Sequence, residues 1–140
     1  MKPLATPALC LLLATSVVPA LAEDPADTAR AVITCQIEAL MKGDNATAYA
    51  LASPAIRGLF TDEDRFSAMV SRNYQPLRQA GRYAFGRSKL VAGGEIVLQE
   101  VMISGENEDW TAVYEMRLQD DGTYRVNGVR MLKNTTSTGI

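Results

Sequence analysis

The chain contains no histidine, and this absence excludes the chemistry most often built on that residue. Histidine is the commonest general base near neutral pH, the usual partner of a serine or cysteine nucleophile, and the commonest metal ligand. Cysteine is scarce as well, with two in 140 residues, so a zinc site would need ligands from scattered carboxylates. No glycine-rich segment precedes a helix in a phosphate-binding pattern. We therefore expect no metal site and no cofactor.

Long apolar runs are missing after residue 22, and the run before it is short. Residues 9–18 are uncharged and mostly apolar, follow Lys2, and end at Pro19 ahead of the small-residue site 20–22. This order is typical of a secretory signal peptide cleaved before Glu23. The run is too short for a membrane span, which needs about 20 apolar residues in a helix. We expect residues 1–22 to be removed, and the mature protein to be periplasmic or secreted without stable membrane insertion.

Removal of the signal peptide would take Cys10 with it and leave Cys35 as the one cysteine of the mature chain. An intrachain disulfide would then be impossible. We expect Cys35 to be a small buried side chain and a free thiol. The alternative is an exposed thiol, which in an oxidising compartment invites an intermolecular disulfide.

Charge is nearly balanced, with a net charge of −2, which makes nucleic acid an unexpected partner. Its distribution is uneven. Residues 65–94 carry six cations and no acid, whereas residues 95–121 carry eight acids and Arg117 alone. One interpretation is that neighbouring strands pair across a ladder, with Arg87 or Lys89 opposite Glu95. The other is a basic patch and an acidic patch, which favour an anionic ligand or head-to-tail self-association.

The first half of the mature chain has helical periodicity. Asp24 followed by Pro25 is an N-cap with proline at the first helical position, and Gly43 is a typical helix end. Further helix starts are predicted at Asp44, at the Ser53-Pro54 pair and at Thr61. Pro76 is expected to end the last of three or four helices.

After Gly81 the periodicity changes to two, which predicts strands. A first strand ends near Gly93, and three more span about 95–103, 109–119 and 123–132. Pairing the second and third strands across the turn 104–108 is expected to keep even positions together on the face that meets the helices. That face would hold Ile96, Leu98, Glu100, Met102, Trp110, Ala112, Tyr114, Met116 and Leu118. The opposite face would hold Gln99, Thr111, Glu115 and Arg117, solvated or covered by a partner.

Helices followed by an antiparallel meander indicate a single α+β domain over residues 23–133. The N-terminal helices should pack on the concave face of a curved, mostly antiparallel sheet of four strands or more. Residues 134–140 are expected to form a disordered tail.

Three segments together resemble a known family: Ala48–Arg57, Phe66–Leu77 and Asp121–Val129. The set is similar to a family of small exported bacterial proteins, classed as a domain of unknown function within the nuclear transport factor 2-like group (also called SnoaL-like or cystatin-like). The likeness extends from about Arg30 to Leu132. It implies a cone-shaped sheet with a long first helix in its concavity, and an exported setting. It implies no reaction, and no catalytic residue can be carried over.

Five residues are candidates for ligand binding: Tyr49, Tyr74, Glu100, Trp110 and Tyr114. Glu100 is the one acid on the predicted apolar face, where burial would raise the pKa of its carboxyl group. The resemblance adds that enzymes of this fold group, such as ketosteroid isomerases, use an acid as proton shuttle with a tyrosine donor. The alternatives are that a bulge turns Glu100 to solvent, or that an arginine such as Arg130 or Arg82 pairs with it.

Trp110 and Tyr114 form an aromatic row with Met116 that can line a pocket, or simply belong to the core. Trp110 is closest to the turn 104–108 and is the member expected at a mouth.

The function favoured by these features is an exported, non-catalytic domain that binds a small ligand or a protein partner. One alternative is a small isomerase or dehydratase with Glu100 as base and a tyrosine as donor. Another is a structural subunit that self-associates, as a homodimer, through the open face of its sheet.

Overall fold

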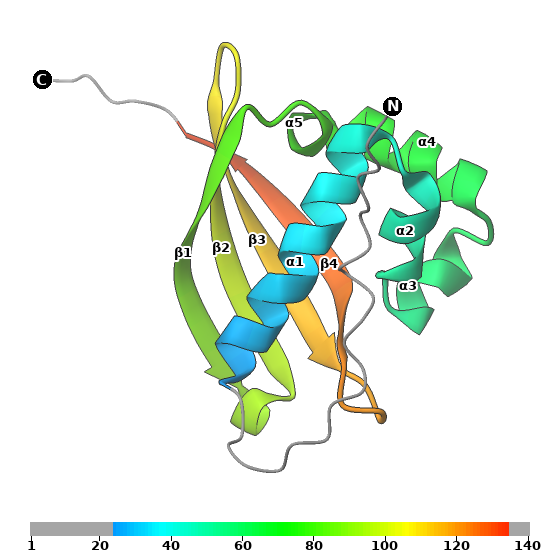
Figure 1. Cartoon of the computed structure of the whole chain (residues 1–140), viewed down its shortest axis with the longest axis vertical. Coiled ribbons are helices and arrows are strands. Elements are labelled where there is room, and N and C mark those ends of the chain that lie inside the picture. The colour runs from blue at the N-terminus through cyan, green and yellow to red at the C-terminus, as the bar shows by residue number, and fades with distance from the viewer. Residues whose placement is uncertain (1–23, 135–140) are drawn as a thin grey trace, which may run out of the picture.

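The computed structural model describes residues 24–134, as helices followed by strands (Figure 1). This order confirms the predicted α+β class. The elements are α1 (Pro25–Lys42), α2 (Asn45–Ala50), α3 (Pro54–Leu59), α4 (Glu63–Asn73), α5 (Gln75–Arg78), β1 (Arg82–Val91), the 3₁₀ turn η3 (Ala92–Gly94), β2 (Ile96–Ser104), β3 (Asp109–Leu118) and β4 (Tyr124–Lys133).

Helix α1 begins and ends where the sequence predicts. The Asp24 side chain accepts a hydrogen bond from the Ala26 N–H (3.1 Å), and Pro25 occupies the first turn, where no N–H donor is needed. Gly43 ends the helix at φ 78°, a left-handed conformation that glycine adopts without a Cβ penalty. The helix lies diagonally across one face of the sheet (Figure 1), and buries Ala29, Ile33, Ile37 and Leu40 against it.

Two details of the later helices differ from the prediction. Helix α4 is capped by Asp62 rather than Thr61, since the Asp62 carboxylate accepts from the Arg65 N–H at 2.9 Å. Pro76 does not end the helical region. The chain leaves helical geometry at Tyr74 (φ −132°), and Pro76 then lies in the first turn of the short α5, a position that tolerates its missing N–H.

The four strands form one antiparallel meander in the order β1-β2-β3-β4. The predicted pairing of β2 with β3 is wrong by one residue, because Ser104 pairs with Asp109 and Val101 with Ala112. Odd positions of β2 therefore share a face with even positions of β3. The buried inner face of these two strands consists of Val97, Gln99, Val101, Ile103, Ala112, Tyr114 and Met116.

The physical reason for this error is visible in β2 itself. Its apolar residues occupy both parities: Ile96 and Leu98 alternate with Val97 and Val101. A strand without a clear polar face specifies its register weakly. Contact with α1 decides which side of β2 faces inward, and α1 is distant from β2 in the sequence.

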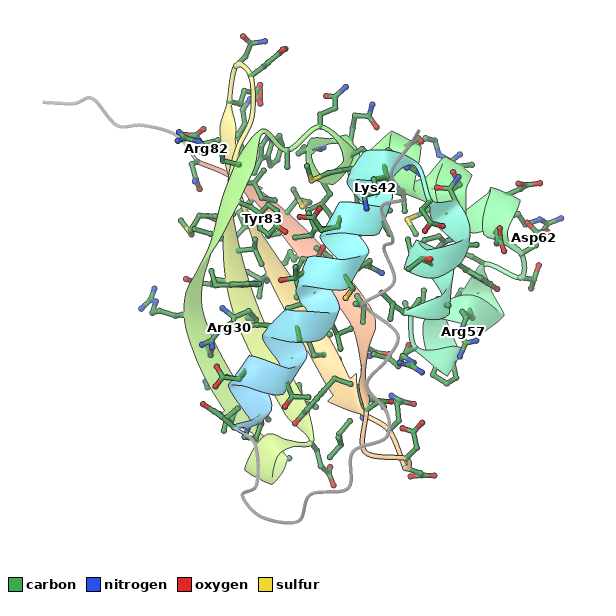
Figure 2. All side chains as sticks on the ribbon, viewed as in Figure 1. Arg30, Lys42, Arg57, Asp62, Arg82 and Tyr83 are labelled. Carbon is green, nitrogen blue, oxygen red and sulfur yellow. The ribbon has the colours of Figure 1, made fainter. Side chains whose placement is uncertain are left out.

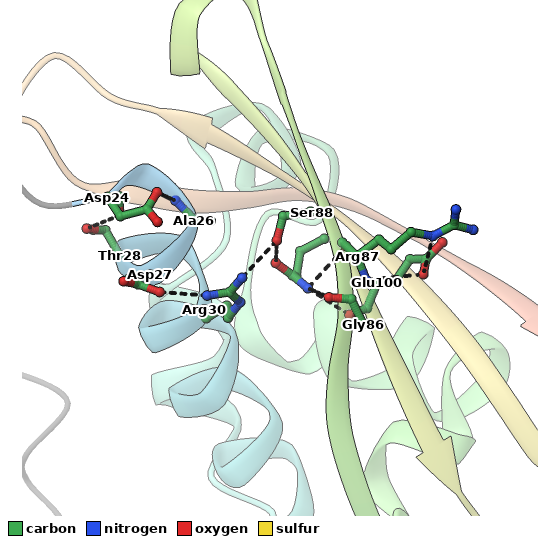
Figure 3. Close-up of polar contacts among 10 residues, drawn as sticks. Asp24, Ala26, Asp27, Thr28, Arg30, Gly86, Arg87, Ser88 and Glu100 are labelled. Carbon is green, nitrogen blue, oxygen red and sulfur yellow. Dashed lines mark hydrogen bonds and ion pairs between the residues drawn. The ribbon is translucent and has the colours of Figure 1, made fainter.

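Gln99 was expected on a face that is solvated or covered by a partner, but it is fully buried in the inner face, beside an irregularity in β1. The pairing of β1 with β2 shifts between Phe85 and Ser88. The Gln99 side-chain N–H₂ donates to the Gly86 and Arg87 carbonyl oxygens (both 3.2 Å), and its oxygen accepts from the Ser88 hydroxyl (Figure 3). Gln99 thus satisfies backbone groups that the irregular pairing removes from the ladder.

Another segment of the chain partly covers the β4 edge of the sheet. Beside β4, the loop after α2 pairs with the strand, as Ser53 donates its N–H to the Val126 oxygen (2.8 Å) and Val126 donates to the Leu51 oxygen (2.9 Å). The helices cover one face of the sheet (Figure 1), and among the described residues no helix covers the other. We call this second surface the outer face.

The expectation of a buried free thiol at Cys35 is wrong. The described residues contain no free cysteine; Cys35 is half-buried on α1 and belongs to a disulfide. Cys10, the other cysteine, lies outside the described residues, as do the predicted signal peptide and most of the predicted tail.

Candidate functional site

A pocket of about 260 Å³ lies between the helices and the edge strand β4. We call it the helix–strand pocket. Helices α1, α3, α4 and α5, the segment that follows α2, and strand β4 supply its lining. The lining residues are Gln36, Leu40, Ala52, Ile56, Phe60, Phe66, Met69, Val70, Asn73, Tyr74, Leu77, Val126, Gly128 and Val129.

The pocket exists because α3 and α4 stand away from the sheet beside β4 instead of packing flat on it (Figure 1). Part of its wall is made of buried core residues such as Phe66 and Leu77. Its remaining wall is made of half-buried apolar side chains, among them Ile56, Met69 and Val129. These side chains have apolar surface that the protein itself does not fully bury, which is the property of a ligand site.

The polar groups of the pocket are few and uncharged. Gln36 is buried, and its side-chain N–H₂ donates to the Ala48 carbonyl (3.1 Å). Asn73 lies exposed at the end of α4. The Tyr74 hydroxyl donates to the Val129 carbonyl (2.9 Å), which ties the junction of α4 and α5 to β4. An uncharged lining of this kind suits an uncharged, mainly apolar ligand.

Of the five predicted binding residues, Tyr74 alone lines this pocket. Tyr49 lies behind it: the ring packs against Phe66 at 5.4 Å between centroids, and the hydroxyl donates to the Phe60 carbonyl (2.7 Å). Tyr49 therefore holds α3 and α4 in place from α2. Trp110 is half-buried and lines a different groove, between α5 and the β2–β3 turn.

Tyr114 lies at the centre of the inner face and lines neither hollow. It is fully buried, and its hydroxyl is one of three buried side-chain polar atoms, among residues 24–134, without a hydrogen-bond partner. Burial, with smaller contributions from Tyr83 and Tyr74, raises the pKa of Tyr114 above its ordinary value. Tyr83 lies on β1 (Figure 2), and its hydroxyl donates a hydrogen bond to the Glu38 carboxylate of α1 (2.8 Å).

The expected position of Glu100 on the apolar inner face is wrong. The true register of β2 places it on the outer face, where its carboxylate accepts from the Arg87 N–H (3.3 Å) and lies 3.6 Å from the Arg87 guanidinium (Figure 3). The expected pairing of Arg87 or Lys89 with Glu95 is replaced by this pair. Glu100 also faces no tyrosine, so the combination that the isomerase alternative requires, an acid as base and a tyrosine as hydrogen-bond donor to the substrate, is not formed around it.

Sequence reasoning missed most of the helix–strand pocket. Ile56, Phe60 and Met69 have the spacing of ordinary core residues on short helices, and nothing local indicates that their far sides face a hollow. The one available signal was the run of short helices between residues 44 and 78, which cannot cover a sheet as smoothly as one long helix.

Metal-binding clusters and membrane-spanning helices are both missing from the described residues. No group of three or more histidine, cysteine, aspartate or glutamate side chains there has the arrangement to hold a metal ion. Within the same residues, no helix combines the length and the apolar character that a membrane crossing requires.

Comparison with known proteins places the fold. The structure is similar to the crystal structure of an NTF-2 like protein of unknown function from Burkholderia xenovorans LB400, with a TM-score of 0.50 and 12% sequence identity, over 82% of this chain and 91% of that chain. The long helix against a curved four-stranded sheet thus defines an α+β cone of the nuclear transport factor 2-like class. Within that class, a family profile described as Domain of unknown function (DUF4864) matches residues 22–139. The chain belongs to this family. No curated protein matches it.

Proposed function

We propose that this chain is an exported, non-catalytic domain that binds a small, uncharged, mainly apolar molecule in the helix–strand pocket. The observation that carries the proposal is the composition of the lining: half-buried aliphatic, aromatic and methionine side chains, with no charged residue among them. The volume of about 260 Å³ is slightly below the roughly 300–1,000 Å³ of drug-sized sites. A ligand of about one or two rings fits this size.

The proposal of a non-catalytic role follows from the same lining. Tyr74 is its one ionisable residue, and the Tyr74 hydroxyl is already hydrogen-bonded to the Val129 carbonyl. A proton-transfer reaction needs a free acid or base within hydrogen-bond reach of the substrate, and the pocket offers none.

A fluorescent probe tests the binding proposal. N-phenyl-1-naphthylamine is uncharged and apolar and fluoresces when it leaves water, so its emission should rise saturably on titration with the protein. Val129→Phe adds a ring to the pocket wall and should weaken this binding about tenfold or more. The matched control is Leu132→Phe on the outer face of the same strand, which should leave the affinity unchanged. Equal affinity in both variants would place the probe elsewhere and contradict the proposal.

Export rests on the signal-peptide pattern of residues 1–22. Intact mass of material secreted by the native host should give a chain that begins at Glu23. Recovery of the chain with residues 1–22 attached would contradict cleavage while leaving the pocket proposal untouched.

A second candidate function is self-association through the outer face. Met102 and Leu132 lie on that face, on either side of Thr111, with 41% and 44% of their surface exposed. Half-buried Leu98 and Val113 lie on the same face, and we call these four residues the apolar strip. An apolar strip of this kind on an uncovered sheet is a typical interaction surface.

A further inference from the structure

A second hollow, of about 630 Å³, lies at the end of the molecule where the β2–β3 turn rises beside α5 (Figure 1). We call it the hairpin groove. It shares no lining residue with the helix–strand pocket. Its lining residues are Gln75, Pro76, Gln79, Gly81, Gly105, Glu106, Asn107, Glu108 and Trp110.

The lining of the hairpin groove combines one large aromatic side chain with hydrogen-bonding groups. Trp110 is half-buried at the start of β3. Three carboxamides line the same groove: Gln75 at the start of α5, Gln79 directly after α5, and Asn107 in the turn. All three side chains are exposed. A carboxamide both donates and accepts hydrogen bonds, so these groups can bind neighbouring hydroxyl groups of one ligand.

The charged residues that line the groove are all acidic. Glu106 and Glu108 line it, and no lysine or arginine does so among the described residues. Glu108 lies 3.4 Å from Lys133, which is outside the lining. Negative ligands are therefore disfavoured, whereas the carboxylates can accept hydrogen bonds from hydroxyl groups.

Two glycines in the lining allow close approach of neighbouring backbone segments. A Cβ at Gly105 would lie 2.8 Å from the Glu108 carbonyl oxygen, and one at Gly81 would lie 3.3 Å from the Ser104 oxygen. The Gly105 N–H donates to the Glu108 oxygen (3.0 Å), so the turn is closed by its own backbone and holds Glu106 and Asn107 at its tip.

We propose that the hairpin groove is a carbohydrate-binding site for sugars without negative charge. A pyranose ring has an apolar C–H face that stacks on an indole, and a rim of hydroxyl groups that matches carboxamide and carboxylate side chains. A purely apolar ligand would leave these polar groups unpaired, and an anionic one would meet Glu106. Quaternary ammonium groups are recognised by cages of aromatic rings, and this groove has one ring.

The chain provides its own reporter for this site, because Trp110 is its single tryptophan. Maltotriose and chitotriose are titrated separately while Trp110 emission is followed, with trigalacturonic acid as the anionic comparison. At least one neutral trisaccharide should change the emission saturably with a Kd of about 1 mM or tighter, and trigalacturonic acid should not. The absence of any change with both neutral sugars, or equal binding of the anionic one, would overturn the proposal.

A matched pair of variants locates the binding. Gln79→Ala removes an exposed side chain from the groove and should raise the Kd of the sugar about fivefold, as expected for one lost hydrogen bond. Gln119→Ala, beyond the opposite end of β3, should leave the Kd unchanged. Unchanged binding in Gln79→Ala would show that the sugar binds elsewhere. Because the two sites share no lining residue, sugar should not displace N-phenyl-1-naphthylamine. A negative result for one binding proposal therefore leaves the other unaffected.

Discussion

At the scale of single residues, Tyr114 and Gln99 are buried neighbours across β2 and β3 with opposite hydrogen-bonding outcomes. Gln99 uses both ends of its carboxamide, whereas the Tyr114 hydroxyl has no partner. A satisfied buried group adds specificity to a core, while an unsatisfied one is destabilising by about 1–3 kcal/mol. Removal of the polar atoms should therefore stabilise the protein at Tyr114 and destabilise it at Gln99.

Tyr114→Phe should raise the free energy of unfolding by about 1 kcal/mol, since it removes an unpaired hydroxyl and keeps the ring. Urea denaturation near pH 7 measures this change. The control is Tyr124→Phe, where a buried hydroxyl that donates to the Gly94 carbonyl is lost, and stability should fall by about 1 kcal/mol. A loss of stability in Tyr114→Phe would mean that its hydroxyl is hydrogen-bonded in solution.

Tyr83 predicts a loss of stability in alkaline solution. Burial, and then the hydrogen bond and charge of Glu38, raise the pKa of Tyr83 from 10.0 to about 12. The folded state therefore holds a proton that the unfolded state releases, so the contribution of Tyr83 is complete below pH 10 and is lost as pH rises toward 12. Urea denaturation at several pH values in this window should show a shallower decline for Tyr83→Phe. An identical decline in both proteins would refute the assignment.

At the scale of elements, Arg78 connects three helices. Its guanidinium donates to the Leu40 carbonyl at the end of α1 (3.3 Å), to the Asn45 side chain of α2 (3.1 Å) and to the Ser67 hydroxyl of α4 (3.0 Å). None of the ion pairs formed among residues 24–134 includes Arg78. Within residues 24–134, Arg78 thus donates to neutral acceptors and positions the helices that line the helix–strand pocket.

Arg78→Met should lower the free energy of unfolding by about 2–3 kcal/mol, because it leaves partly buried acceptors without donors. It should also weaken N-phenyl-1-naphthylamine binding, since α4 loses a fixed position. Arg72→Met on the exposed side of α4 is the control and should change stability by less than about 0.5 kcal/mol. Chemical denaturation and probe titration of both variants check this pair of expectations.

At the scale of the whole molecule, the uncovered outer face predicts a twofold dimer. Residues of both signs lie on it, with Glu100 and Glu115 near Arg117 and Arg130 in the strand register. Such a surface can pair with the same surface of a second copy. The two apolar strips would then be in contact, and acidic residues of one copy would face arginines of the other.

Sedimentation velocity should show a dimer that Met102→Glu converts to a monomer, since a charge would be buried at the centre of the apolar strip. Leu59→Glu is the control, because Leu59 is 72% exposed on α3 and away from the sheet. The Leu59→Glu variant should remain a dimer. A wild-type monomer at every concentration tested would exclude this mode of association.

Much of this fold could be predicted from the sequence because its signals are local. The Asp24-Pro25 start and Gly43 end of α1 depend on groups within a few residues of each other, as do the hairpin turn at 120–122 and the change of periodicity near Gly81. The order of helices and strands then leaves few ways to bury their apolar faces, and the α+β class follows.

Tertiary structure decided which face of β2 is buried, and with it the position of Glu100. The strand is apolar at both parities, so its own residues stabilise either orientation. Contact of α1 with Val97, Val101 and Ile103 selects one. The helix–strand pocket depends on distant residues in the same way, since it exists only where α3, α4 and β4 meet incompletely. Local hydrogen bonding and backbone preference are encoded within short segments, whereas register and cavities arise from packing between segments far apart in the chain.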